Sequence, residues 1–235
     1  MRFAPFAFEN PDLFQGLTIN LWQGNYTANS TTWNNLQPYA NATMATGGFG
    51  KTTNVITGLN FTGTTSTTLF TINSDGIWDA LSPWTIMIYM NITSTVNKGF
   101  WHKSSSSTNG MSTAFFNNPY YALRAPTATQ QVNQAAITVR GTNVYTYVAD
   151  GLVGVPSAST VQYWLNKTAP AMTYVNANAS TDLRWNNGFQ FKFGYAAANI
   201  TDPPIQGVLN RVLIWNRKLN PQEIAQAVDY CTNNA

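Results

Sequence analysis

Residues 189–195 alternate strictly between aromatic and other side chains. Because successive residues of a strand point to opposite faces, this pattern predicts a strand with one buried and one solvated face. Other short apolar or β-branched runs recur along the chain, separated by turn residues, and they are typical of a sandwich or jelly roll. The predicted strands are residues 55–61, 68–72, 84–92, 99–103, 111–116, 120–124, 135–140, 144–149, 189–195 and 207–215.

The pattern changes to helical spacing after the last predicted strand. Asn220 is a preferred N-cap residue, Pro221 suits the first helical position, and Glu223 completes a capping box three residues after the cap. Apolar residues then recur at helical spacing, which predicts one face pressed on a sheet. These residues are Ile224, Ala227, Val228 and Cys231.

Residues 1–16 differ from the rest and are predicted to form an apolar N-terminal arm, followed by one domain over residues 17–235. Two prolines, Pro5 and Pro11, prevent a regular helix, and the segment is too apolar to extend freely into water. We therefore expect the arm to pack either on its own domain or on a neighbouring subunit. Its candidate contact residues are Phe3, Phe6, Phe8 and Phe14.

Composition limits the kinds of partner. The 235 residues are 44% hydrophobic, enough for a core without disulfides, but only 9% are charged. Neutral amides and hydroxyls must therefore make up the solvated surface, which suits a subunit of an assembly or an extracellular protein. The net charge of +3 is scattered along the chain, so we expect no nucleic-acid partner.

The sequence carries no sign of membrane insertion or export. No stretch is apolar enough to span a membrane, and the N-terminal residues lack the apolar core and cleavage motif of a secretory signal. The composition suits a protein outside the cell, but no export signal is present. A virion protein explains both observations, because it folds inside the host cell. A secreted domain whose signal is missing from the sequence would explain it equally well.

Four segments occur in an order and spacing similar to those of one domain family. They are residues 31–36 (TTWNNL), 58–63 (GLNFTG), 84–90 (WTIMIYM) and 143–151 (NVYTYVADG). With the strand and helix at the C-terminal end, they resemble the laminin-G-like, concanavalin A-like lectin and glucanase domains, which also occur in phage virion structural proteins. The resemblance implies an all-β fold: a two-sheet antiparallel β-sandwich of jelly-roll, concanavalin A-like type with a short C-terminal α-helix.

The chain departs from the family pattern where acidic residues are usual. Asn34 or Asn35 stands in place of an aspartate in the first motif, and Thr62 in the second. The family commonly binds calcium through such oxygen ligands. The acidic residues that remain in loops, Asp150, Asp182 and Asp202, are more typical of turns. We therefore expect no cofactor or metal: calcium belongs to the resemblance but is not supported by the residues.

Catalysis is not expected either. Glycoside hydrolysis requires two converging carboxyl groups, but the only glutamates are Glu9, in the arm, and Glu223, in the predicted cap. Asp75 and Asp79 flank a glycine and predict a turn. His102, the single histidine, has no acidic or cysteine neighbour in the sequence for a triad or zinc site.

Sugar binding requires an aromatic ring beside neutral hydrogen-bonding groups. Two clusters meet this requirement, although aromatic residues of a sandwich usually belong to its core. The candidate ligand-binding residues are Asn117, Asn118, Tyr120 and Tyr121, and Trp185, Asn186 and Asn187.

Together these observations predict a non-enzymatic virion structural protein, a capsid decoration or tail-associated subunit, on the virion surface. We expect a homo-oligomer that contacts other virion proteins such as the major capsid protein, with a glycan or the host surface as a further partner. The alternative is an extracellular carbohydrate-binding or adhesion module.

Overall fold

A computed structural model of the chain describes residues 11–44, 48–53, 55–62, 69–73, 82–93, 98–104, 110–115, 119–125, 128–134, 140–150, 161–176, 190–194 and 205–233. The strands are β1 (Leu17–Tyr26), β2 (Thr32–Asn35), β3 (Ala42–Met44), β4 (Lys51–Thr53), β5 (Thr57–Phe61), β6 (Phe70–Ile72), β7 (Pro83–Ile92), β8 (Lys98–Ser104), β9 (Gly110–Phe115), β10 (Pro119–Ala125), β11 (Ala128–Gln134), β12 (Gly141–Asp150), β13 (Val161–Leu165), β14 (Met172–Asn176), β15 (Phe191–Phe193) and β16 (Gly207–Trp215). A 3-10 helix, η1 (Pro11–Phe14), precedes them, and α1 (Pro221–Asn233) follows.

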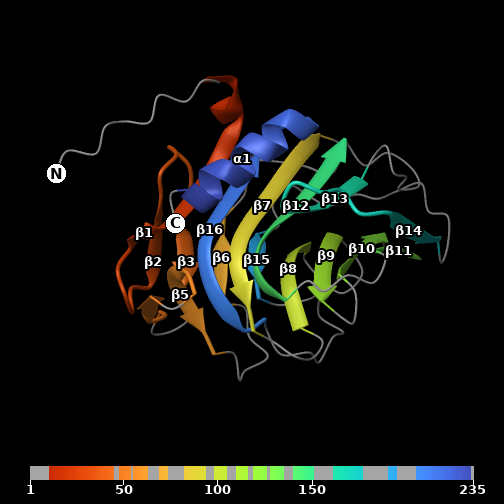
Figure 1. The fold of residues 1–235 in the computed structure, drawn as a ribbon. Coiled ribbons are helices and arrows are strands. Elements are labelled where there is room, and N and C mark those ends of the chain that lie inside the picture. Colours follow the sequence, from red (N-terminus) through yellow and green to blue (C-terminus); the bar gives the residue numbers. More distant parts are fainter. Residues whose placement is uncertain are drawn as a thin grey trace.

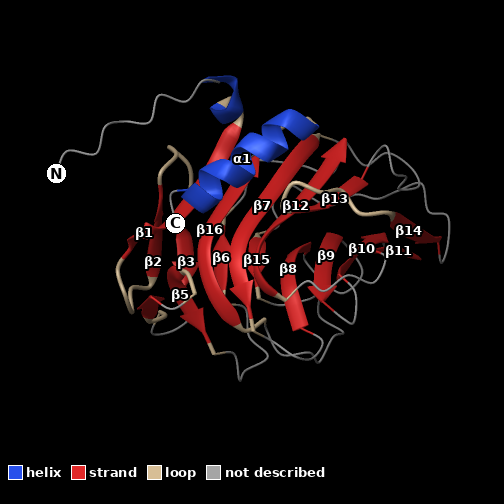
Figure 2. Cartoon of the chain, in the orientation of Figure 1, coloured by secondary structure: helices blue, strands red, loops and turns tan. Residues whose placement is uncertain are grey.

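The strands pair in one antiparallel order, β13-β12-β7-β16-β1-β2-β3-β6-β15-β8-β9-β10-β11-β14, with β5 added beside β16 and β4 beside β5. This long sheet curls over so that its two halves form facing layers (Figures 1 and 2). The first layer contains β12, β7, β16 and β1, and the second contains β6, β15, β8 and the strands that follow them in the pairing order. The predicted all-β sandwich with one C-terminal α-helix is therefore confirmed. In the pairing order, β2 and β3 connect β1 of the first layer to β6 of the second.

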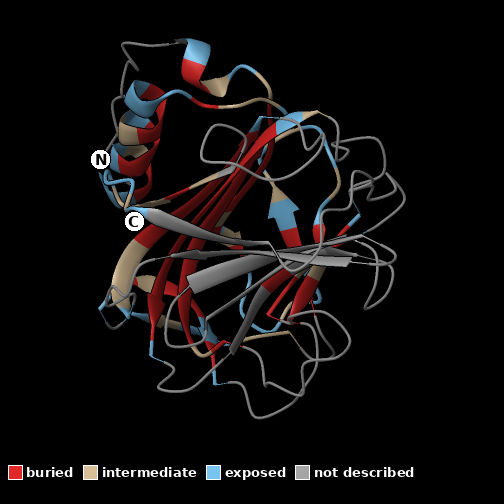
Figure 3. Ribbon diagram, turned by 90° about the vertical axis from the view of Figure 1, so that its right-hand side faces the viewer, coloured by how far each residue is buried: buried red, intermediate tan, exposed pale blue. Residues whose placement is uncertain are grey.

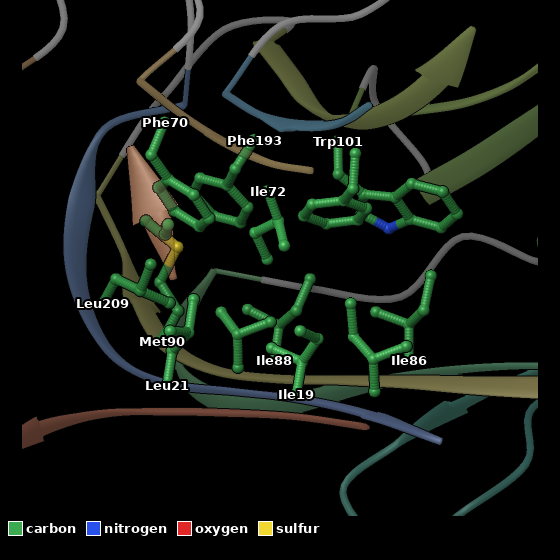
Figure 4. Packing of buried hydrophobic residues seen from close by; sticks show 14 of the residues in the cluster. Ile19, Leu21, Phe70, Ile72, Ile86, Ile88, Met90, Trp101, Phe193 and Leu209 are labelled. Atoms are coloured by element: carbon green, nitrogen blue, oxygen red, sulfur yellow. The ribbon is translucent and has the colours of Figure 1, made fainter. Parts of the chain in front are cut away.

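The central strand β7 is buried on both faces. Ile86, Ile88 and Met90 face the interior between the layers, whereas Met87 and Tyr89 face the helix side. Such a continuous apolar run is what a strand covered on both sides requires. Figure 4 shows the interior packing, in which β-branched and aliphatic side chains of one layer meet the rings of Phe70, Trp101 and Phe193 from the other.

Aromatic rings fill much of the interior. Trp101 stacks on Phe191 with ring centroids 5.5 Å apart and meets Trp84 edge-on at 6.2 Å. Phe70 stacks on Phe193 at 4.9 Å. Buried rings of this kind contribute large apolar areas and a further 0.5–1.5 kcal/mol or so per pair. Most of the aromatic residues that the structure describes are therefore structural.

The C-terminal helix begins as the sequence predicts. Asn220 Oδ1 accepts hydrogen bonds from the backbone N–H groups of Gln222 and Glu223 at 2.9 and 3.0 Å. Glu223 Oε2 in turn accepts from the backbone N–H of Asn220 at 2.8 Å, so the capping box is confirmed. Glu223 Oε1 also forms an ion pair with Arg217 at 2.8 Å, which fixes the strand-to-helix connection.

The predicted apolar face of α1 is also confirmed. Ile224, Ala227, Val228 and Cys231 are buried against the outer face of the first layer, and Figure 3 shows the opposite side of the helix exposed. At the other end of the helix, the buried guanidinium of Arg211 lies 4.4 Å from the ring centroid of Tyr230. Arg211 Nη1 also donates to the Tyr230 carbonyl at 3.3 Å. A cation from β16 thus neutralises the partial negative charge of the last helical turn.

Residues 11–16 pack on the sandwich. Leu13 is buried, and its carbonyl accepts a hydrogen bond from Trp215 Nε1 at 2.8 Å. Arg217 donates to the carbonyls of Asp12 and Gln15 at 2.8 and 2.7 Å. Residues 1–10 lie outside the described residues, so the role of the arm in assembly and the boundary at residue 17 stay predictions.

Several strands were absent from the strand prediction. It did not include β1, β3, β4 or β11, nor β13 and β14, which lie within residues 152–185 and pair with β12 and β11. The paired strands supply hydrogen bonds that composition alone does not reveal. The strand expected over 135–140 lies outside the described residues except for Arg140, so it stays a prediction.

Candidate functional site

The two aromatic clusters proposed from the sequence are only partly described. Tyr120 and Tyr121 occupy successive positions of β10, which pairs with β9 and β11 in the second layer. Successive strand positions alternate between the two faces of a sheet, so the backbone does not place this pair on one surface. Asn117, Asn118, Trp185, Asn186 and Asn187 lie outside the described residues.

The apolar arm residues have a similar status. Phe3, Phe6 and Phe8 lie outside the described residues. Phe14 is half-buried, and its ring meets that of Tyr230 edge-on with centroids 5.3 Å apart. Phe14 therefore contacts α1 of its own chain, and its part in assembly stays a prediction.

The described carboxyl groups have structural contacts. Glu223 belongs to the helix cap, and Asp150 forms an exposed ion pair with Lys218 at 2.9 Å. Asp75 and Asp79, like Asp182, Asp202 and Glu9, lie outside the described residues. His102 occupies β8, opposite Lys192 and Ser112.

The part of the chain that the structure describes contains no group of three or more His, Cys, Asp or Glu residues close enough to hold a metal ion. Among the same residues, no helix is both long and apolar enough to cross a membrane.

The strongest candidate for a binding surface is the hairpin formed by β2 and β3. Its inner face is anchored by Trp33, which is fully buried and pairs across the strands with Ala42. The Trp33 ring lies 6.0 Å from that of Tyr26 and 5.8 Å from that of Phe70, and its Nε1 donates to the Trp22 carbonyl at 2.8 Å. The hairpin is therefore held firmly against the core.

The loop that joins β2 to β3 is organised by the side chain of Asn35. Its Oδ1 accepts hydrogen bonds from the backbone N–H groups of Asn20 and Gln37 at 2.8 and 3.1 Å. Its Nδ2 donates to the carbonyls of Thr18 and Ala40 at 3.1 and 3.4 Å. An aspartate could accept the first two bonds but could not donate the last two. This explains why an amide fits at Asn35, one of the two asparagines in the motif where the resembled family usually has an aspartate.

The outward face of this hairpin combines apolar and neutral polar residues. Leu36 and Tyr39 are 47% and 46% exposed, whereas most other large apolar side chains among the described residues are buried. Exposed amide and hydroxyl side chains lie on the paired strands beside them. We call this set the β2–β3 surface: Thr32, Asn34, Leu36, Tyr39, Asn41 and Thr43.

The β2–β3 surface belongs to a segment without charge. Between Asp12 and Lys51 the sequence contains no acidic or basic residue. Lys51 itself is directed at the end of β1, where its Nζ donates to the carbonyls of Gln23 and Tyr26 at 2.8 and 3.3 Å. The residues of this surface therefore offer stacking and neutral hydrogen bonds, and a basic residue, Lys192, lies two strands away from Thr43 across Thr71.

Sequence reasoning missed this surface, although a signal for it was present. Tyr39 is flanked by amides at Gln37 and Asn41. The same combination of an aromatic residue and amides made Tyr120 and Trp185 candidate ligand-binding residues. The exposure of Tyr39 depends on the loop geometry set by Asn35, which the sequence alone does not show.

The buried ionisable side chains are poor candidates for acid–base chemistry. Burial raises the pKa of Tyr163 well above its ordinary value, and nearby Tyr147 and Tyr145 add to the effect. Burial likewise raises the pKa of Cys231 to about 12, although Arg211 opposes the shift. These groups remain protonated near neutral pH and contribute to packing.

Comparisons with known proteins identify the fold. No protein-family model matches the sequence, and no curated protein matches it either. Among solved structures, Trypanosoma rangeli sialidase in complex with sialic acid is similar at TM-score 0.61 and 13% identity, over 94% of this chain and 33% of that chain.

Botulinum neurotoxin binding domains are also similar. The serotype D/C domain matches at TM-score 0.64 and 11% identity, over 93% of this chain and 53% of that chain. The DC domain in complex with rat synaptotagmin II matches at TM-score 0.62 and 13% identity. The chain thus spans about a third of the sialidase and half of the toxin binding domain. At these identities the likeness shows the fold alone, an antiparallel β-sandwich.

Proposed function

We propose that this chain is a non-enzymatic, lectin-like binding module that contacts glycans or a host surface. The observation that carries the proposal is the β2–β3 surface: an exposed tyrosine and leucine on a loop whose backbone is fixed by Asn35. Exposed apolar groups on a preorganised loop favour binding, because little conformational entropy is lost when a ligand docks.

The chemistry of the described acids supports a binding role over catalysis. Hydrolysis of a glycoside by two carboxyl groups requires that they flank one bond at a separation of roughly 5–10 Å. Glu223 is held in a helix cap by Asn220 and Arg217, and Asp150 pairs with Lys218. Asp229 pairs with Lys167, so each of these three carboxyl groups already has a basic or backbone partner. A sialidase shares the fold, but it is about three times as long as the matched region, so its activity does not transfer with the fold.

The similar toxin domains support the same proposal at the level of architecture. One of them is a binding domain in complex with rat synaptotagmin II, and the match covers 52% of it, so a sandwich of this fold occurs within a binding domain. The ligand of that domain is not carried over to this chain.

A finer proposal concerns location. With only 9% charged residues, the chain lacks the charge that usually keeps free proteins apart, and this favours a subunit held within an assembly. We infer a place on the exterior of a virion, as a homo-oligomer bound to other virion proteins such as the major capsid protein. Phe3, Phe6 and Phe8 of the arm are proposed contacts.

Two measurements test these proposals separately. Glycan-array binding by the purified chain tests the module: specific binding to glycans is expected, and turnover of any glycan in the panel would contradict the non-enzymatic role. Immunogold electron microscopy of particles released by the source tests the location. Label on the particle exterior is expected. Label confined to particle-free extracellular material would instead favour an extracellular adhesion module.

A further inference from the structure

The β2–β3 surface has the chemistry of a sugar site. Tyr39 presents an aromatic ring that is 46% exposed, and such rings stack on the apolar faces of sugars. Asn34 and Asn41 offer amide donors and acceptors, and Thr32 and Thr43 offer hydroxyls, all of them exposed. These are the groups that hydrogen-bond sugar hydroxyls without charge.

The geometry of the hairpin places the polar groups on one face. Thr32 pairs directly with Thr43, and Trp33 pairs with Ala42. The same antiparallel register brings Asn34 opposite Asn41, next to the loop that carries Tyr39. Because Trp33 and Ala42 are buried, the alternate positions Thr32, Asn34 and Thr43 face solvent together.

The loop is fixed before any ligand arrives. Asn41 is exposed, and its Oδ1 accepts from the backbone N–H of Asn35 at 2.9 Å, which orients the Asn41 amide. Pro38 restricts the backbone immediately before Tyr39, whose N–H donates to the Gln37 carbonyl at 2.8 Å. A ligand therefore meets a preformed arrangement.

We propose that the β2–β3 surface is a glycan site selective for uncharged sugars, with Tyr39 as its stacking platform. This inference rests on the proposed binding function and specifies its ligand class. An acidic sugar would lose hydration of its carboxylate on docking and would need a cation in return. Lys51 is instead bonded to strand carbonyls, and Lys192 lies two strands beyond Thr43, across Thr71. Although the fold is shared with a sialidase, the site favours neutral glycans over sialylated ones.

The test uses a panel of neutral oligosaccharides, each paired with its sialylated derivative, and isothermal titration calorimetry on the strongest binders. The wild-type chain is expected to bind neutral members and to gain nothing from sialylation. Binding is also expected to change less than about twofold between low and high salt, since no ion pair forms.

Variants locate the site. Tyr39→Ala is expected to weaken binding by about tenfold or more, because it removes the ring that stacks on the sugar. Tyr39→Phe keeps the ring and should stay within about threefold of wild type. Val55→Ala is the matched control, because Val55 is an exposed apolar residue (66%) outside the β2–β3 surface. Thermal unfolding of each variant verifies that it is folded.

The outcomes that overturn the inference are distinct from those that overturn the proposed function. Stronger binding to the sialylated partners would refute the selectivity for neutral sugars. Persistent glycan binding by Tyr39→Ala, at the level of Val55→Ala, would refute this site and leave the binding function intact. If the wild-type chain binds no member of the panel, the proposed function fails together with the inference.

Discussion

The side chain of Asn35 accepts a hydrogen bond from the backbone N–H of Asn20 at 2.8 Å, which links the loop after β2 to strand β1. The same amide donates to two carbonyls that a carboxylate would repel. Asn35→Asp is therefore expected to lower the free energy of unfolding by about 1–3 kcal/mol. Urea denaturation measures the change.

The neighbouring substitution Asn34→Asp is the matched control, because Asn34 is exposed on the same strand. It should change stability by no more than about 0.5 kcal/mol. Equal effects of the two substitutions would show that the Asn35 network does not hold the loop.

The helix cap at Asn220 predicts a second measurable effect. Asn220→Ala removes the acceptor of two backbone N–H bonds and is expected to cost about 1 kcal/mol of stability. Gln222→Ala, at an exposed position in the same turn, should cost much less. Thermal unfolding followed by circular dichroism compares them, and a smaller loss for Asn220→Ala would contradict the capping account.

Two buried tyrosines should respond oppositely to loss of the hydroxyl. Tyr26 OH donates to the Ser30 carbonyl at 2.9 Å and accepts from the Phe49 N–H at 2.7 Å. Tyr26→Phe should therefore lower the free energy of unfolding by about 1–2 kcal/mol. The Tyr163 hydroxyl is buried with no hydrogen-bond partner among the described residues. Tyr163→Phe should therefore be neutral or stabilising in chemical denaturation. A loss as large as that of Tyr26→Phe would reveal a partner for Tyr163.

Cys231 should be chemically inert in the folded chain. Burial raises its pKa from an ordinary value of 9.0 to about 12, so the reactive thiolate is almost absent at pH 8. Ellman's reagent should label it only at the rate of unfolding, and rapidly in guanidinium chloride. Fast labelling of the native chain would contradict the buried position.

The same shift in pKa gives a pH dependence. Because the folded pKa of the Cys231 thiol is raised, its contribution to stability is fully present below about pH 9 and is lost as the pH rises towards 12. A Cys231→Ala variant should show a smaller loss of stability than wild type over this range.

Much of the fold follows from local signals in the sequence. The helix could be predicted because Asn220, Pro221 and Glu223 form a cap within four residues. Strand β7 could be predicted because its apolar run is continuous. Strands β13 and β14 were missed because each is only five residues long and is defined by its pairing. β13 pairs with β12, and β14 pairs with β11, which is distant from it in the sequence.

The candidate site was harder to predict than the fold. Aromatic residues beside amides occur at several places, and whether each ring is buried depends on packing between the layers. The Asn35 network, with partners as distant as Thr18, ties the loop to β1, and Tyr39 is exposed on that loop. In the sequence, either Asn34 or Asn35 could replace the usual aspartate, and only the structure shows that Asn35 organises the loop.

A solution NMR titration of the full chain with neutral oligosaccharide tests the central claim most directly, because backbone amides report the contact region residue by residue. Chemical-shift changes concentrated in residues 32–43, and absent in Tyr39→Ala, are the predicted result. Changes centred instead on β10, around Tyr120 and Tyr121, or no saturable changes at all, would contradict the β2–β3 surface as the binding site.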